Sequence, residues 1–190
     1  EDCMSNSDQS GGGGALYFND YNYDVSFESS TFTNCSAENG GALFFYQNNS
    51  DVSFELCNFT NCTAAYGGAL LFDQYNYDVS FESSNFTSCI SENGNGGALN
   101  IHDYNYNFSF ESSNFTKCSA DEGSGGALYF NDYNYNVSFE SSNFTKCSAA
   151  YGGALNIQDY NYNFSFESSN FTSCSADEGN GGALVFGQNN

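Results

Sequence analysis

The tetrapeptide Gly-Gly-Ala-Leu occurs seven times along the chain, and this repeat constrains the fold more than any other feature of the sequence. Successive copies are separated by 27 or 29 residues. They begin at Gly13, Gly40, Gly67, Gly96, Gly125, Gly152 and Gly181. The two-residue difference always falls between the Cys of one repeat and the next Gly-Gly, which predicts a surface loop at that point.

Three short segments of each repeat alternate between apolar and polar residues, as half-buried strands do. In the first repeat they are 15–18, 25–28 and 32–35. The inward positions recur as Phe or Ile in the first segment, Val or Phe in the second and Cys in the third. The position of Tyr17 varies, to Leu71 and Asn100 in later repeats, and is predicted to point outward. Every repeat therefore predicts one coil of three strands.

The predicted fold is all-β: a right-handed parallel β-helix (β-solenoid) with three short strands per 27–29-residue coil and about six to seven coils. No stretch has a helical period of 3.6, and a propeller blade would need 40 or more residues. Coils of such a solenoid stack about 4.8 Å apart. Its core is expected in two columns, Phe27, Phe54, Phe81, Phe110, Phe139, Phe166 and Phe32, Phe59, Phe86, Phe115, Phe144, Phe171.

One turn position is always Asn, which predicts a ladder of stacked amides. The column is Asn22, Asn49, Asn76, Asn105, Asn134 and Asn161. Asn tolerates the left-handed backbone conformation, and amides one coil apart are expected to hydrogen-bond to each other.

The recurring Gly13–Leu16 motif and the 32–35 segment Phe-Thr-Asn-Cys resemble the GGA[I/L/V] and FxxN repeats of chlamydial polymorphic outer-membrane proteins and related β-helical adhesins. The resemblance covers nearly the whole chain and implies a β-helix with an adhesive surface role. The second motif departs from that family, because Cys stands where the family has Asn, as at Cys35.

The charge is strongly acidic, with 23 Asp and Glu against only Lys117 and Lys146. Such a surface repels phosphate backbones, so we expect no nucleic-acid partner. No run of 18 or more apolar residues is present, so no membrane insertion is expected. We expect an extracellular or cell-surface location.

Eleven Asn-x-Ser/Thr sequons predict covalent N-glycans, although copying of one chance match by the repeat is an alternative origin. They are Asn34, Asn48, Asn58, Asn61, Asn85, Asn107, Asn114, Asn136, Asn143, Asn163 and Asn170.

Eight cysteines occur in a pattern that predicts one inward column. Cys35, Cys62, Cys89, Cys118, Cys147 and Cys174 share one repeat position, Cys3 is expected to continue it, and Cys57 replaces a Ser at another. Neighbouring coils bring such residues within disulfide range, and a dry ladder of free thiols packs equally well. Zinc is not expected, since CxxC spacing and His ligands are lacking.

An outward column of glutamates predicts either a solvated acidic face or weak Ca²⁺ binding between coils. The column is Glu28, Glu55, Glu82, Glu111, Glu140 and Glu167, with a second, partial column at Asp20, Asp103, Asp132 and Asp159. Recognised calcium-loop motifs are absent, so no cofactor is expected beyond loosely bound calcium.

Paired tyrosines in the same turn predict an aromatic rib that either shields the turn or contacts carbohydrate or neighbouring fibres. The pairs begin at Tyr21 and Tyr23 and recur at Tyr75/Tyr77, Tyr104/Tyr106, Tyr133/Tyr135 and Tyr160/Tyr162. A catalytic site should interrupt the repeat, and His102, the single histidine, stands where other coils carry Asn, Gln or Asp. With no arginine in the chain, we do not expect an enzyme.

No capping segment is evident, so residues 1–190 are expected to form a single β-solenoid domain, uncapped at both ends, within a longer array. Such a chain is expected to self-associate end to end. The primary hypothesis is an extracellular structural protein that forms a rod or fibril and carries N-glycans. The alternative is a cell-surface adhesin passenger domain that binds host, matrix or carbohydrate ligands. An ice-binding surface is disfavoured, because the Thr33–Thr172 column has no matching second rank.

Overall fold

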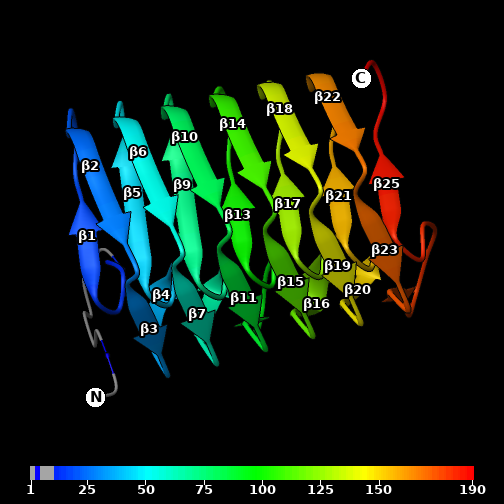
Figure 1. Cartoon of the computed structure of the whole chain (residues 1–190). Helices are drawn as coiled ribbons and strands as arrows, with labels where there is room; N and C mark the ends of the chain where they lie inside the picture. Colours follow the sequence, from blue (N-terminus) through cyan, green and yellow to red (C-terminus); the bar gives the residue numbers. More distant parts are fainter. Residues whose placement is uncertain (1–2, 5–10) are drawn as a thin grey trace.

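The chain forms a parallel β-solenoid in which every coil lies directly against the next (Figure 1). The computed structural model describes residues 3–4 and 11–190. Residues 1–2 and 5–10 of the predicted 1–190 domain lie outside the described residues. All pairings between the named strands are parallel and join equivalent residues of neighbouring coils, for example Phe81 with Phe54 and with Phe110. The predicted all-β solenoid is confirmed.

The first sheet contains the Ala-Leu segments and has seven strands, in the order β1-β5-β9-β13-β17-β21-β25. Their bounds are β1 Leu16–Phe18, β5 Leu43–Gln47, β9 Leu70–Gln74, β13 Leu99–Ile101, β17 Leu128–Phe130, β21 Leu155–Ile157 and β25 Leu184–Phe186. The second sheet has six strands, β2 Tyr23–Glu28, β6 Ser50–Glu55, β10 Tyr77–Glu82, β14 Tyr106–Glu111, β18 Tyr135–Glu140 and β22 Tyr162–Glu167.

The third sheet also has six strands, β3 Thr31–Thr33, β7 Asn58–Thr60, β11 Asn85–Thr87, β15 Asn114–Thr116, β19 Asn143–Thr145 and β23 Asn170–Thr172. A fourth sheet follows, with β4 Ser36–Asn39, β8 Thr63–Tyr66, β12 Ile90–Ser91, β16 Ser119–Ser124, β20 Ser148–Tyr151 and β24 Ser175–Ala176.

The fourth sheet corrects the prediction of three strands per coil. It lies in the segment that the sequence indicated to be a loop, and its buried positions hold small residues such as Ala64, Ser91 and Ala120. Small side chains give no apolar alternation, which is why the strand is not visible in the sequence. The two extra residues of a 29-residue coil are absorbed here, as a register shift between Ala120 and Ser124 where β16 pairs with β20.

Each coil turns its four corners on residues in the left-handed conformation. In the first full coil these are Tyr21 (φ 60°), Ser29 (φ 50°), Asn34 (φ 52°) and Gly40 (φ 54°), and the same four columns recur. The prediction that the column of Asn22 takes this conformation is wrong. The backbone turns one residue earlier, at Tyr21, because the Asn side chain is committed to the neighbouring coil.

The Asn column forms the predicted ladder between coils. Both the backbone nitrogen and Nδ2 of Asn49 donate to Oδ1 of Asn76, at 3.1 and 2.9 Å. In the following coils the backbone link continues, from Asn76 N to Asn105 Oδ1 at 2.7 Å and from Asn105 N to Asn134 Oδ1 at 3.0 Å. Asn49 through Asn161 are fully buried, so these bonds are shielded from water and hold the coils in register.

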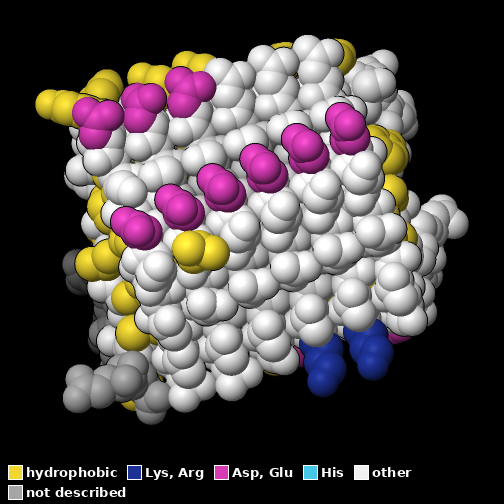
Figure 2. Space-filling view, in the orientation of Figure 1, with side chains coloured by type: hydrophobic (Ala, Val, Ile, Leu, Met, Phe, Trp, Pro, Cys, Tyr) yellow, Lys and Arg dark blue, Asp and Glu magenta, His cyan; other side chains and the backbone are white. Residues whose placement is uncertain are grey.

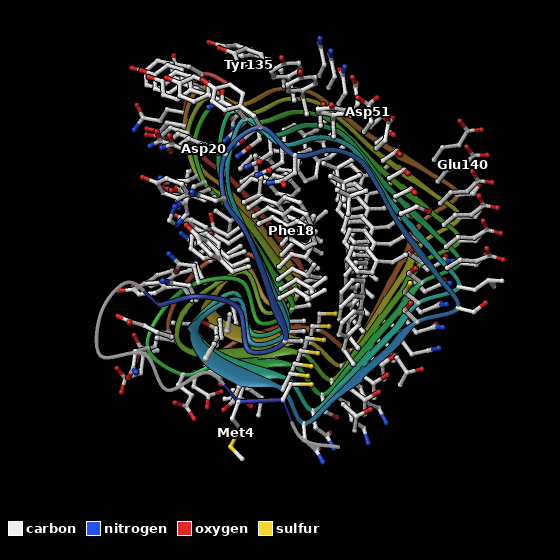
Figure 3. The ribbon with its side chains drawn as sticks, turned by 90° about the vertical axis from the view of Figure 1, so that its left-hand side faces the viewer. Met4, Phe18, Asp20, Asp51, Tyr135 and Glu140 are labelled. Atoms are coloured by element: carbon white, nitrogen blue, oxygen red, sulfur yellow. The ribbon has the colours of Figure 1, made fainter. Side chains whose placement is uncertain are left out.

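The core is a set of parallel phenylalanine stacks inside the coils, as predicted (Figure 3). Phe81 stacks on Phe54 and Phe110 with ring centroids 4.6 and 4.9 Å apart, and it meets Phe86 of the next column edge-on at 5.8 Å. Burying one such side chain stabilises the fold by about 1.5–3 kcal/mol, and well-placed aromatic pairs add about 0.5–1.5 kcal/mol.

No helix in the described part of the chain is long and apolar enough to span a membrane.

Candidate functional surfaces

The glutamate column forms a straight acidic row across the second sheet (Figure 2). Parallel pairing places each Glu beside its equivalent, as with Glu82 between Glu55 and Glu111, and all six side chains are exposed. Within residues 3–4 and 11–190, no group of three or more His, Cys, Asp or Glu side chains is arranged to hold a metal ion. The six glutamates therefore form a solvent-exposed acidic face, and calcium binding to this face stays a prediction.

The partial aspartate column brings three carboxylates together at the corner after the first sheet. Burial, followed by the charges of Asp103 and Asp159, raises the pKa of Asp132. Asp103 accepts a hydrogen bond from Asn131 Nδ2 at 2.7 Å, and Asp159 accepts one from the backbone nitrogen of Gln188 at 2.6 Å. Both donors belong to the protein itself, so Asp103 and Asp159 each accept at least one hydrogen bond without a bound ligand or metal ion.

The largest sequon column forms an amide ladder along the third sheet. From Asn85 on, Nδ2 of each Asn donates to Oδ1 of the Asn one coil earlier, at 3.0 to 3.2 Å. Its members are Asn58, Asn85, Asn114, Asn143 and Asn170. A glycosylated amide keeps one N–H, so this ladder and an attached glycan are chemically compatible only if that hydrogen still points along the column.

The other sequons lie outside the third sheet, and all of them except the half-buried Asn48 are exposed. Asn107, Asn136 and Asn163 are exposed within the second sheet and have left-handed backbone conformation, at φ of 60°, 57° and 59°. Asn34, Asn48 and Asn61 lie at coil corners, and Asn34 and Asn61 are exposed. Glycosylation of any of these sites stays a prediction.

The tyrosine ribs stack along the rod, as one of the two interpretations predicted. Tyr104 stacks on Tyr75 and Tyr133 with centroids 5.3 and 5.0 Å apart. The second rib stacks in two pairs, Tyr77 with Tyr106 at 5.0 Å and Tyr135 with Tyr162 at 5.5 Å. The rings therefore stack on one another along the rod and cover the coil corner beneath them.

The predicted cysteine column is buried from Cys35 to Cys147 and half-buried at Cys174, and these thiols are free. From Cys62 on, each thiol lies near the carbonyl oxygen of a Phe of the preceding coil, as Cys89 Sγ does to Phe59 O at 3.6 Å. Cys57 belongs to the buried column of Ser84 and Ser113, where its Sγ lies 3.4 Å from Phe27 O. The structure has these thiols unbonded, and disulfide pairing between coils stays a prediction.

Burial makes these thiols hard to ionise, which predicts loss of stability in alkali. Burial raises the pKa of Cys35 to about 12, and a hydrogen bond with Cys118 is the first cause that raises the pKa of Cys147 to about 12. In the unfolded chain thiols ionise near pH 9, so between pH 9 and 12 the unfolded state holds fewer protons and stability falls as pH rises.

Urea unfolding under reducing conditions at pH 8 to 11 measures this effect. Each such thiol should contribute a slope of about 1.4 kcal/mol per pH unit. Cys118→Ala should lower the total slope by about that amount, while Ser119→Ala, its half-buried neighbour, should leave the slope unchanged. An equal slope in wild type and Cys118→Ala would contradict the assignment.

One feature was not found by sequence reasoning: a groove over the outer face of the first sheet, with a volume of about 480 Å³. Its floor is the column Tyr17, Phe44 and Leu71, which register pairing aligns. The column was predicted to point outward, and it does point away from the core, yet Phe44 and Leu71 are only 8% and 2% exposed.

Polar and aromatic side chains border the groove. On one side Asn39 Nδ2 donates to Gly11 O at 3.0 Å. On the other side are Tyr46, Asp73 and His102, with His102 Nδ1 2.9 Å from Asp73 Oδ1. The signal that could have revealed the groove was the divergence of two columns from coil to coil: the floor column, and the column two residues on, which contains Tyr46, Asp73 and the single histidine His102.

No family model, curated protein or solved structure matches this chain.

Proposed function

We propose that this chain is an extracellular structural protein whose coils stack end to end into a rod or fibril, with N-glycans on its sequons. The observation that carries the proposal is the uniform register of the coils. Equivalent residues of successive coils pair in parallel in all four sheets, so each coil is a template for pairing with the next. The proposal assigns the chain no catalytic role and no resident cofactor.

Apolar side chains at the two ends supply the driving force. Leu16 at the first coil is 43% exposed, whereas its column neighbour Leu43 is fully buried. Phe186 at the last coil is 51% exposed, whereas Phe45 of the same column is fully buried. Stacking would bury both residues as interior coils bury theirs. It would also extend the acidic row, so we expect assembly to increase with salt, which screens like charges.

A single methyl group tests the stacking. In the interior coils a Cβ on the second Gly of the motif would overlap the carbonyl oxygen of the next coil's equivalent Gly, as Gly153 would with Gly182. At Gly182 the nearest atom is Cys174 O at 3.6 Å, so Ala fits there in a single chain. A second protomer stacked in register would place a carbonyl oxygen at this position, and that oxygen would clash with the Cβ of Ala.

Gly182→Ala should therefore fold normally by circular dichroism and fail to assemble. Sedimentation velocity and electron microscopy at rising salt would show rods for the wild type and single chains for Gly182→Ala. Gly12→Ala, whose Cβ would meet Tyr17 Cβ at an ordinary 3.5 Å, should assemble like the wild type. Wild-type chains that stay single, or Gly182→Ala chains that assemble equally, would disprove end-to-end stacking.

A cell-surface adhesin is the second candidate function, in line with the resemblance of the Gly-Gly-Ala-Leu repeat to chlamydial polymorphic outer-membrane proteins. The groove over the first sheet favours it, because a rod needs no such recess. In this case the solenoid presents a binding surface rather than only spanning a distance.

A further inference from the structure

The end of the groove at His102 differs in hydrogen bonding from three other coils. In those coils the outward residue of the first sheet bonds to the residue two positions on, as Tyr17 OH does to Asn19 Oδ1 at 3.2 Å. Tyr129 OH donates to Asn131 Oδ1 at 3.1 Å, and Gln158 Nε2 donates to Asn156 Oδ1 at 2.9 Å. In the fourth coil, His102 replaces that partner and bonds to Asp73 instead.

This exchange leaves Asn100 without its usual partner. Asn100 pairs with Leu71 as the next residue of the same column, just beyond the residues that line the groove, and is 1% exposed. Among the described residues, its Oδ1 is the one buried side-chain oxygen or nitrogen that lacks a hydrogen-bond partner. A buried acceptor left unsatisfied destabilises a fold, and native proteins keep such groups mainly where a ligand or function uses them.

We infer that the groove binds a neutral, linear oligosaccharide, which gives the adhesin candidate a ligand class and goes beyond the stacking proposal. Tyr17, 47% exposed, and the half-buried Tyr46 offer ring faces to the apolar faces of sugar rings. Asp73 and His102 offer an acceptor and a ring nitrogen to hydroxyl groups. Asn100 lies next to Leu71 at the end of the groove, and a hydroxyl that reached its Oδ1 would be the donor that it lacks.

Other ligand classes fit the groove less well. Anionic glycans and nucleic acids are repelled by a chain of net charge −21 whose two lysines lie outside the groove. An extended peptide would need open backbone groups, and β5 and β9, which carry the floor residues Phe44 and Leu71, already pair with strands on both sides. A purely apolar ligand would leave the polar groups at the border unpaired.

Titration calorimetry with defined hexasaccharides tests the inference. The probes are β-1,4-linked glucose, β-1,4-linked N-acetylglucosamine and β-1,3-linked glucose hexasaccharides, with a galacturonic acid hexasaccharide and a basic peptide as alternatives. We expect at least one neutral probe to bind and both alternatives to fail. The inference is overturned by no neutral binding at millimolar concentration or by binding of only the acidic glycan or peptide.

Variants locate the site. Tyr46→Ala and His102→Asn should each weaken binding about tenfold, since a lost stacking or hydrogen-bond contact is worth about 1.4 kcal/mol at that ratio. Tyr162→Ala, with a similarly exposed ring outside the groove, and Gln158→Asn, the equivalent of His102 two coils on, should leave affinity unchanged. Equal affinities in all four variants would place binding elsewhere.

Asn100→Leu separates a ligand site from a packing defect. It introduces the residue that the previous coil has at this position, Leu71, so it should raise the melting temperature and weaken oligosaccharide binding. Asn156→Leu removes a satisfied acceptor and should lower the melting temperature with no effect on binding. Asn100→Leu that binds as tightly as the wild type would remove Asn100 from the site. Repeating the titration in Gly182→Ala keeps the outcome independent of stacking.

Discussion

Phe110→Asp is expected to open the solenoid at its centre. Phe110 is 1% exposed and lies between Phe81 and Phe139, at centroid distances of 4.9 and 4.7 Å. Removing a buried Phe side chain costs about 3–5 kcal/mol, and an unpaired carboxylate in the same place adds to that cost. The total approaches the whole stability of a typical domain, about 5–15 kcal/mol.

Urea unfolding followed by circular dichroism, with hydrogen exchange to locate the opening, measures this effect. Neighbouring coils depend on each other, so exchange should rise first in β10, β14 and β18. Ser109→Asp is the matched control, because it adds the same charge to the same strand at a half-buried outward position, and it should change stability by about 0.5 kcal/mol or less. A wild-type unfolding midpoint for Phe110→Asp would refute the inward assignment of this column.

Gly97→Ala is the second change with a large expected effect. A Cβ on Gly97 would overlap the carbonyl oxygen of Gly126. That carbonyl cannot retreat easily, because Gly97 N and Ala98 N bond to Gly125 O and Ala127 O of the same coil at 3.1 and 2.8 Å. Overpacking against side chains costs about 1–3 kcal/mol, and backbone atoms held in a ladder yield less, so we expect a loss at the upper end or beyond.

Thermal unfolding of dilute, single chains measures the cost. Gly182→Ala again serves as the matched control, since it places the same methyl group at the same position of the motif in a coil with no clash. It should be neutral or stabilising by about 0.4–1 kcal/mol, because Ala restricts the unfolded chain more than Gly does. Similar melting temperatures for the two variants would show that the coils are less tightly apposed than described.

The fold was predictable from the sequence where large side chains mark the inside of a strand. Phe27 and Phe32 repeat in register, and their columns stack as expected. The fourth strand of each coil was not predicted, because its buried positions hold Ala and Ser, and these small residues are equally common in loops. The corner conformation was placed on Asn22 instead of Tyr21, because propensity identifies Asn as the tolerant residue and does not show where its amide is needed.

The groove could not be predicted, because it depends on contacts between residues of different columns. Phe44 and Leu71 look like ordinary outward residues, yet both are buried in the structure. Likewise, Asn100 lacks a hydrogen-bond partner because His102 bonds to Asp73 of the preceding coil and not to Asn100. Contacts between different columns are set by three-dimensional geometry, whereas contacts within a column can be read from the repeat.

The register shift in β16 shows how this architecture accommodates length variation. Two additional residues enter the fourth sheet there, while the strands before and after them, β15 and β17, keep their pairing with β19 and β21. That corner is consequently a natural insertion point for foreign peptides. Grafting one epitope into each coil at this position would display a linear array of copies at the coil spacing, about 4.8 Å apart.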